Sequence, residues 1–113
     1  MKVIVAGSRS GFVERNTFEA IEQSGFSITE IVSGCCAGVD KHGEYYASVN
    51  KIPVKRFPAD WNYLGLAAGP VRNKQMAEYA DALVAVWDGK SKGTKNMIES
   101  MQSLKKPVFI YKR

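Results

Sequence analysis

The chain has 113 residues, 45% of them hydrophobic, and a formal net charge of +5 at pH 7. The length predicts one domain over residues 1–113, and the composition excludes an intrinsically disordered chain. No apolar run approaches the roughly 18 residues of a membrane span, and a glycine loop follows the first short apolar run where the core of a signal peptide would continue. We therefore expect a cytoplasmic protein with no membrane partner.

Short apolar runs alternate with longer segments of helical periodicity along the chain. The expected strands are rich in Val, Ile and Phe, and they cover Lys2–Ala6, Glu30–Ser33, Pro53–Phe57, Ala82–Val86 and Pro107–Tyr111. The expected helices are Phe12–Ser24, Val39–Asn50, Pro70–Tyr79 and Gly93–Leu104. This alternation is typical of an α/β domain with helices on both faces of a five-stranded parallel sheet, and two-way winding gives the strand order 3-2-1-4-5.

A sheet of this kind binds ligands beyond the carboxyl ends of its strands, where the first and fourth strands lie side by side. The loop after the first strand, residues 7–11, reaches that edge. Gly7 allows a sharp turn there, while Ser8 and Arg9 add side-chain donors to the free N–H groups of the next helix. The loop is not G-x-G-x-x-G, and the chain has no G-x-x-x-x-G-K-[ST], so ordinary dinucleotide binding and Walker-type ATP hydrolysis are disfavoured.

The loop after the second strand consists of small residues whose backbone N–H groups are suited to a phosphate. Its candidate ligand residues are Gly34, Cys35 and Gly38. Asp40 and Glu44 follow one helical turn apart, where two carboxylates can hold ribose hydroxyls or position a water molecule. Two alternatives stay open, because Asp40 can instead cap the helix and Glu44 can belong to a solvated helix face.

The loop after the fourth strand places Gly93 and Thr94 at a helix start, which supplies a backbone donor and a hydroxyl donor to an anion. Lys90 and Lys92 lie in the same loop and strengthen anion binding. Trp87, at the end of the strand, either stacks on a base or packs in the core. Three glycine loops that converge on one edge favour an anionic ligand.

The segment between the third strand and the third helix is a long excursion. Asp60 and Trp61 within it form either a lid or wall of the site or the anchor of a packed loop. Arg72 and Asn73 are expected in the first turn of the third helix. A cation there opposes the helix dipole unless an anion is near, so Arg72 is a stronger ligand candidate than an average arginine.

The chain offers little for metal or disulfide chemistry. Its two cysteines, Cys35 and Cys36, are adjacent, and His42 is its single histidine. Neither a disulfide framework nor a zinc site is predicted, and no cofactor is expected. The charge is uneven, because residues 89–113 hold seven Lys or Arg and only one acid. Such a basic end can attract phosphate or nucleic acid, or can simply be solvated surface.

Five motifs in chain order resemble the YspA-type proteins of the SLOG superfamily. They are Ala6-Gly7-Ser8-Arg9, Ser33-Gly34 with Gly38 and Asp40, Phe57-Pro58-Ala59-Asp60-Trp61, Ala68-Gly69-Pro70 with Arg72-Asn73 and Met76, and Gly93-Thr94 with Met97-Ile98. The superfamily includes the lonely-guy phosphoribohydrolases and the DNA-processing protein A. The resemblance implies a Rossmann-like three-layer fold whose glycine loops bind nucleotides, nucleotide-derived signals or, in some members, single-stranded DNA. It also implies a homodimer.

The enzymes of that superfamily cleave the N-glycosidic bond of a nucleoside monophosphate, and the resemblance places Arg72 at the position of their catalytic arginine. Their glycine loop ends in Gly-Thr-x-x-Glu, and the glutamate acts in catalysis. This sequence has Met97 at that position. Methionine cannot supply a proton, so either Asp40, Glu44 or another acid replaces the glutamate, or the site binds its ligand without cleaving it.

Three hypotheses follow from these observations. The leading one is a domain that binds a nucleotide or a nucleotide-derived ligand and senses, carries or sequesters it. The alternative is a hydrolase of nucleoside monophosphates or ADP-ribose-like compounds, with Arg72 on the phosphate and Asp40 or Glu44 as general acid or base. The third is a protein that binds single-stranded nucleic acid through the basic end, with Trp87 or Trp61 stacking on bases.

Overall fold

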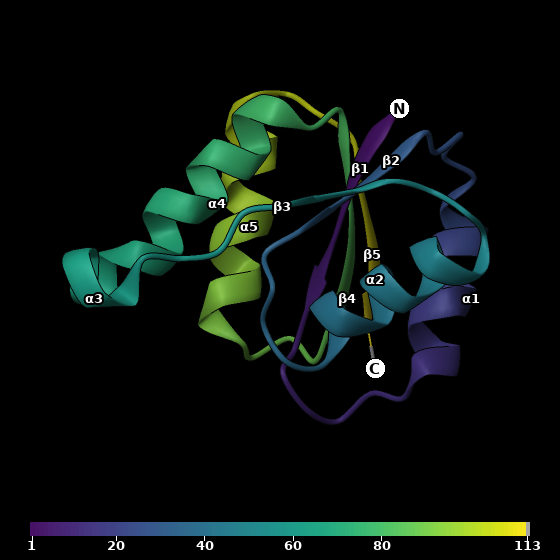
Figure 1. The fold of residues 1–113 in the computed structure, drawn as a ribbon, viewed down its shortest axis with the longest axis horizontal. Coiled ribbons are helices and arrows are strands. Elements are labelled where there is room, and N and C mark those ends of the chain that lie inside the picture. Colours follow the sequence, from purple (N-terminus) through teal and green to yellow (C-terminus); the bar gives the residue numbers. More distant parts are fainter. Residues whose placement is uncertain (113) are drawn as a thin grey trace.

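The computed structural model describes residues 1–112 and contains one parallel sheet in the order β3-β2-β1-β4-β5 (Figure 1). Its strands are β1 (Lys2–Gly7), β2 (Glu30–Ser33), β3 (Val54–Arg56), β4 (Ala82–Trp87) and β5 (Val108–Lys112). Its helices are α1 (Glu14–Ser24), α2 (Val39–Val49), α3 (Trp61–Leu64), α4 (Ala68–Tyr79) and α5 (Lys92–Ser103), with the 3-10 turn η1 (Gly65–Ala67). The predicted α/β class and the strand order 3-2-1-4-5 are confirmed, and the arrangement is Rossmann-like.

Helices cover both faces of the sheet, with α1 and α2 on one side and α4 and α5 on the other (Figure 1). Successive residues of a strand point to opposite faces, so β1 serves two cores. Val3 and Val5 pack with the side chains of α1 and α2. Ile4 and Ala6 pack with those of α4 and α5. Burial on both faces explains why the central strands β1 and β4 are continuous apolar runs in the sequence.

Two glycines allow close approaches of the backbone, one between a helix and the sheet and one between two strands. A Cβ atom on Gly43 of α2 would lie 2.8 Å from Val5 Cβ, so only glycine lets this helix approach β1 as it does. A Cβ atom on Gly7 would lie 2.0 Å from the carbonyl oxygen of Val86 in β4. The loops after β1 and β4 therefore begin side by side.

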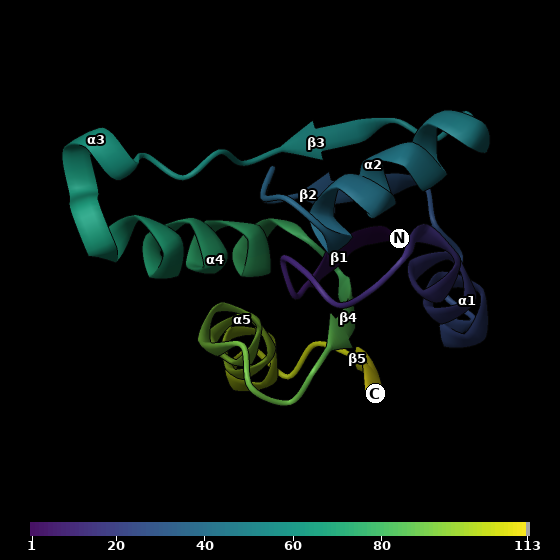
Figure 2. The ribbon, with the colours of Figure 1, turned by 90° about the horizontal axis from the view of Figure 1, so that it is seen from below.

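Residues 61–67, which form α3 and η1, are an arm that projects from the sheet layers (Figure 2). The sequence predicted an excursion here but no helix. Asp60 caps α3, because its Oδ1 accepts a hydrogen bond of 3.2 Å from Tyr63 N. Gly65 ends the helix with a φ of 56°, a left-handed conformation that favours glycine. The arm then turns back into α4.

The start of α4 differs from the prediction. The helix begins at Ala68 rather than Pro70, so Arg72 and Asn73 lie in its second turn and not in its first. Pro70 is tolerated at the third position because the first N–H groups of a helix have no partner within the helix. The prediction that Arg72 lies in the first turn and opposes the helix dipole is therefore wrong. Arg72 is a site residue because of its contacts. Among residues 1–112, no helix has the length and hydrophobicity needed to cross a membrane.

Candidate functional site

A cavity of about 670 Å³ lies where the loops after β1 and β4 meet the start of α4 and the arm. We call it the main cavity. It combines nine of the residues predicted for the site, and these are Gly7, Ser8, Arg9, Asp40, Trp61, Arg72, Asn73, Gly93 and Thr94. Its volume falls in the range of about 300–1,000 Å³ that is usual for small-molecule sites. The carboxyl edge of the sheet therefore carries a ligand-sized cavity, as the strand order predicts.

Ser8 joins the loops that follow β1 and β4. It is 3% exposed, its backbone N donates to Val86 O over 3.1 Å, and its Oγ accepts a bond of 3.3 Å from Asp88 N. Gly38 has a φ of 77°, and a Cβ atom there would lie 2.5 Å from Arg9 O. Gly38 lets the loop after β2 pack on the loop after β1, and it does not itself line the main cavity.

The loop between β4 and α5 is held by its own side chains. Asp88 Oδ1 accepts bonds of 2.8 Å from the backbone N atoms of both Lys90 and Ser91, and these bonds lower the pKa of Asp88 below its ordinary value. Trp87 donates its indole N–H to Ser91 O over 3.1 Å and packs against the core. Trp87 therefore supports the loop, and the structure does not bring it to the cavity.

The start of α5 borders the main cavity through Lys92, Gly93 and Thr94. A Cβ atom added to Gly93 would meet no described atom within 4 Å, so the backbone there is accessible. Thr94 is 4% exposed, and its hydroxyl lies 3.2 Å from Ser91 Oγ. Unpaired N–H groups and the helix dipole make such a terminus favourable for an anion.

Arg72 is 8% exposed and connects three parts of the chain. Its Nη1 donates to Gly34 O over 2.5 Å and to Phe57 O over 3.5 Å. Its Nε donates to Asn73 Oδ1 over 3.0 Å, and Nη2 contacts Cys36 Sγ at 3.8 Å. Most of the guanidinium donors thus bind the protein, and the residue also lines the main cavity.

Asn73 helps to hold the Arg72 guanidinium in place, because its Oδ1 accepts the hydrogen bond from Arg72 Nε. Its side-chain N donates to Asn96 Oδ1 over 2.9 Å and to Gly93 O over 3.3 Å. Asn73 is 5% exposed, and it links α4 to the start of α5. The sequence did not point to Asn96, because its position beside Asn73 depends on the packing of two helices that are distant along the chain.

Asp40 is the buried acid of the site. Burial raises its pKa to about 6, against the opposing effects of the hydrogen bond from Cys36 N and the charge of Arg72. Its Oδ2 accepts that bond from Cys36 N over 3.1 Å, and the residue is 5% exposed. The carboxyl group therefore exchanges its proton near neutral pH at the wall of the main cavity.

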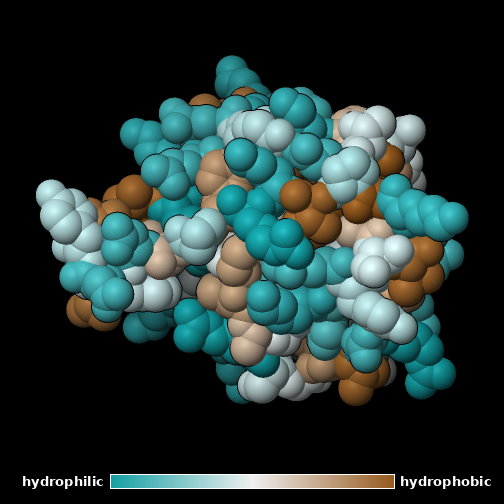
Figure 3. Space-filling model, in the orientation of Figure 1, coloured by the Kyte–Doolittle hydropathy of each residue, from teal (hydrophilic) through white to brown (hydrophobic). Residues whose placement is uncertain are grey.

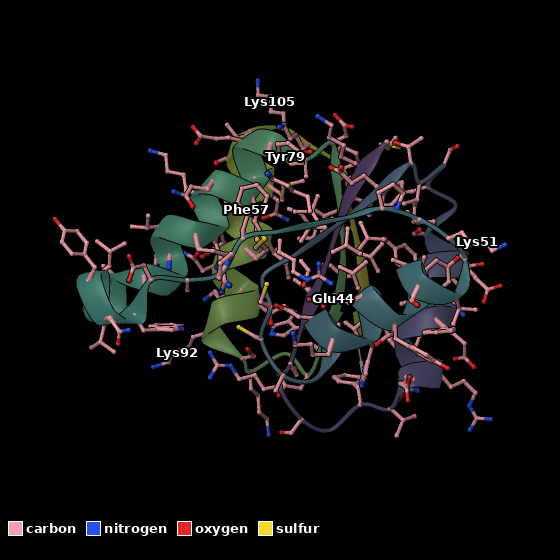
Figure 4. All side chains as sticks on the ribbon, viewed as in Figure 1. Glu44, Lys51, Phe57, Tyr79, Lys92 and Lys105 are labelled. Atoms are coloured by element: carbon pink, nitrogen blue, oxygen red, sulfur yellow. The ribbon has the colours of Figure 1, made fainter. Side chains whose placement is uncertain are left out.

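Glu44 lies one turn further along α2 (Figure 4). It lines neither cavity. Its carboxylate accepts a bond of 2.6 Å from Ser33 Oγ and two bonds from Arg56, at 3.2 and 3.3 Å. Partial burial raises its pKa, but the bond from Ser33 and the charges of Lys41 and Arg56 outweigh that effect and lower it. Of the two predicted carboxylates, only Asp40 reaches the main cavity.

A second cavity of about 360 Å³ adjoins the main cavity, and Gly34 and Cys35 are among its lining residues. Both cysteines are free thiols. Cys35 has a left-handed φ of 67°, which turns the chain so that Cys36 contributes to the walls of both cavities. The sequence argument selected Cys35 and missed Cys36, since the residues are adjacent and only the backbone turn distinguishes them. Asp60, the cap of α3, lines neither cavity.

The basic residues near the C-terminus are spread over the molecule. Lys92 begins α5, and Lys105 follows the opposite end of that helix (Figure 4). Lys106 Nζ donates to Ala77 O and Ala80 O over 2.8 and 2.7 Å, so it caps the end of α4. Lys92 and Lys105 therefore do not share one surface, and nucleic-acid binding stays a prediction. In residues 1–112 no group of three or more His, Cys, Asp or Glu could hold a metal ion.

The chain was compared with models of known protein families, with curated proteins and with solved structures, and none of the three comparisons found a match. The resemblance to the SLOG superfamily therefore rests on the sequence motifs. The arrangement of the site has to be interpreted from its own geometry.

Proposed function

We propose that this domain binds a nucleotide or a nucleotide-derived phosphate compound in the main cavity and acts as a sensor, carrier or sequestering protein. The observation that carries the proposal is the convergence of Arg9, Arg72 and the start of α5 on a single ligand-sized cavity. Two guanidinium groups and a helix N-terminus are each favourable for phosphate, and together they surround the same space.

The main cavity offers distinct partners for the parts of a nucleotide. Gly93, Thr94 and Lys92 provide a backbone, a hydroxyl and an ammonium donor for phosphate. Trp61 and Leu66 from the arm provide an apolar wall for a base. Ligand sites commonly combine an apolar wall with a few placed polar groups, which supports a nucleotide over a simple inorganic anion.

The test is a Gly93→Val variant, measured by native mass spectrometry against a panel of nucleoside monophosphates and ADP-ribose forms. The valine side chain covers the accessible backbone at the start of α5. We expect the affinity for the ligand of the wild-type protein to fall at least about tenfold, the scale of one lost charge-assisted hydrogen bond.

Gln102→Val is the matched control, because it introduces the same residue into α5 at an exposed position outside the main cavity. It should bind like the wild-type protein. Undiminished affinity of Gly93→Val would contradict the assignment of the phosphate to the start of α5.

Hydrolysis of the bound nucleotide is the second candidate, favoured by the pKa of about 6 of Asp40 in the cavity wall. A carboxyl group that titrates near the working pH is suited to general acid or base catalysis. Met97, which also lines the cavity, cannot take this part. The same experiment separates the two candidates, because a hydrolase converts the free nucleotide to base and ribose phosphate, whereas a binding protein leaves the free pool unchanged.

We also propose a homodimer in which the arms of two copies pack together. Residues 61–71 contain no charged side chain, although the chain as a whole is 24% charged. Tyr63 is 85% exposed and Leu66 is 93% exposed, and Figure 3 shows hydrophobic residues on this projecting end. An uncharged apolar patch can be complementary to itself, as a two-fold interface requires, and charged residues are depleted from interface cores.

A further inference from the structure

The second cavity borders the main cavity, and the two share part of their walls. Arg9, Cys36 and Trp61 line both of them. The remaining walls of the second cavity come from the loop after β2 and from Pro58 and Ala59, which precede the arm. Its volume of about 360 Å³ also falls in the range of small-molecule sites. A ligand in the main cavity can therefore extend past Arg9 into a second space.

We propose that the ligand has two parts: a nucleotide in the main cavity, and a second ring-bearing group, attached through the phosphate, in the second cavity. This inference rests on the proposed nucleotide binding of the main cavity. Dinucleotides and nucleotides whose diphosphate carries a further nucleoside or sugar belong to this class. The second cavity thus sets specificity for a substituted phosphate over a simple monophosphate.

Arg9 is placed to bind the linking phosphates. Its side chain is exposed on the shared wall. Within residues 1–112, the one hydrogen bond of its guanidinium is a contact of 3.8 Å from Nη2 to Cys36 Sγ. Arg72, by contrast, uses most of its donors inside the protein. The free fork of Arg9 can therefore bind two phosphate oxygens between the cavities.

The lining of the second cavity suits a neutral ring better than a cationic group. Trp61 and Pro58 give it flat apolar walls, and Ala37 and Ala59 keep it open. A Cβ atom on Gly69 would lie 3.4 Å from the indole of Trp61, so the tryptophan rests on the backbone of α4. Arg9 is the one charged residue among the described lining residues, and it disfavours a cationic group. A base or another neutral ring can stack on the indole.

The experiment compares two kinds of ligand on two proteins. Isothermal titration measures the four nucleoside monophosphates and the symmetrical 5′–5′ dinucleoside diphosphate of each base. The variant is the double substitution Ala37→Leu and Ala59→Leu, which fills the second cavity from two sides and leaves the lining of the main cavity unchanged. Ser48→Leu is the control, because it introduces the same residue at an exposed position of α2 that lines neither cavity and lies outside the arm.

The expected result is that the wild-type protein binds the dinucleoside diphosphate at least about tenfold more tightly than its monophosphate, the scale of one base stacked on an aromatic ring. The double variant should lose this gain and keep the monophosphate affinity, while Ser48→Leu keeps both. Circular dichroism checks the fold, and the single variants Ala37→Leu and Ala59→Leu give the same comparison if the double variant is unstable.

Two results would overturn the inference while leaving the proposed function intact. One is equal affinity of the wild-type protein for the monophosphate and its dinucleoside diphosphate. The other is a gain that persists when the second cavity is filled. If no nucleotide of either kind binds the wild-type protein, the proposed function itself is wrong, and the inference fails with it.

Discussion

At the scale of single residues, Asp40 shows most directly how burial changes the acidity of a side chain. Its carboxyl group is 5% exposed, yet it lies against the cavity and accepts a hydrogen bond from the turn at Cys36. Burial raises its pKa from 3.8 to about 6, and the charge of Arg72 counteracts only part of this effect. Asp40 is therefore protonated in the folded protein over a pH range where the unfolded chain is ionised.

We predict that Asp40→Asn changes how stability depends on pH. Between about pH 4 and pH 6 the folded wild-type protein holds a proton that the unfolded chain has released, so its unfolding free energy falls as the pH rises and then levels off. The difference between pKa values of 3.8 and about 6 corresponds to about 3 kcal/mol. Asparagine cannot ionise, so the variant does not show this fall. In urea unfolding, the unfolding free energy of the variant relative to that of the wild type should therefore rise by about this amount between pH 4 and pH 7.

Glu44→Gln is the control with the opposite sign. The pKa of Glu44 is lowered in the folded protein, so its contribution to stability is present above the ordinary pKa and lost as the pH falls. This variant should lose stability relative to the wild type as the pH rises from 3 to 5. Parallel pH profiles for Asp40→Asn and the wild type would contradict the raised pKa.

Arg72 holds together several elements that are distant in the sequence. From α4 it binds the carbonyl oxygen of Gly34 after β2 and that of Phe57 after β3. A Cβ atom on Gly34 would lie 2.7 Å from Arg72 Nη1, so the loop after β2 is shaped around this side chain. The guanidinium therefore positions the walls of both cavities.

Replacement by Arg72→Lys should lower the unfolding free energy by about 2–3 kcal/mol, because one ammonium group cannot reach all the acceptors that the guanidinium binds. Urea denaturation measures the change. Arg15→Lys, at an exposed position of α1, is the matched control and should stay within about 0.5 kcal/mol of the wild type. If both variants were equally stable, Arg72 would not connect these elements as described.

The distribution of charge and apolar surface describes the molecule as a whole. A net charge of +5 makes two copies repel each other at long range. The uncharged arm projects away from the sheet layers, so two copies can meet there with their bodies apart (Figures 2 and 3). Because Trp61 and Leu66 also line the main cavity, contact between arms would influence ligand access.

Sedimentation equilibrium tests the proposed homodimer. The wild-type protein should be dimeric at micromolar concentration, with association strengthened by salt, which screens the repulsion between copies. The double variant Tyr63→Ser and Leu66→Ser should be monomeric, because it removes the two most exposed apolar side chains of the arm. Val49→Ser, at a 55% exposed position of α2, should leave the association unchanged. A monomeric wild-type protein, or a dimer that survives the double substitution, would refute the role of the arm.

Much of the fold could be predicted because its signals are local. The central strands β1 and β4 are apolar on both faces, and the alternation of strands with helical segments indicates a parallel sheet. The start of α4 was misplaced because Pro70 fits any position of a first helical turn. The arm was missed as a helix because α3 has only four residues, too few for a periodic pattern.

The sequence by itself determined the sheet, the edge of the sheet that carries the main cavity and nine of the residues that line this cavity, because glycine loops and strand order follow from local chemistry and from the handedness of the crossovers. The tertiary structure decided which polar groups face the cavity. Asp40 and Glu44 look equivalent along α2, yet only Asp40 lies at the cavity wall, whereas Glu44 binds Ser33. Trp87 donates its indole N–H to Ser91 O and does not line the cavity. Such outcomes depend on contacts between segments far apart in the chain, which no local pattern encodes.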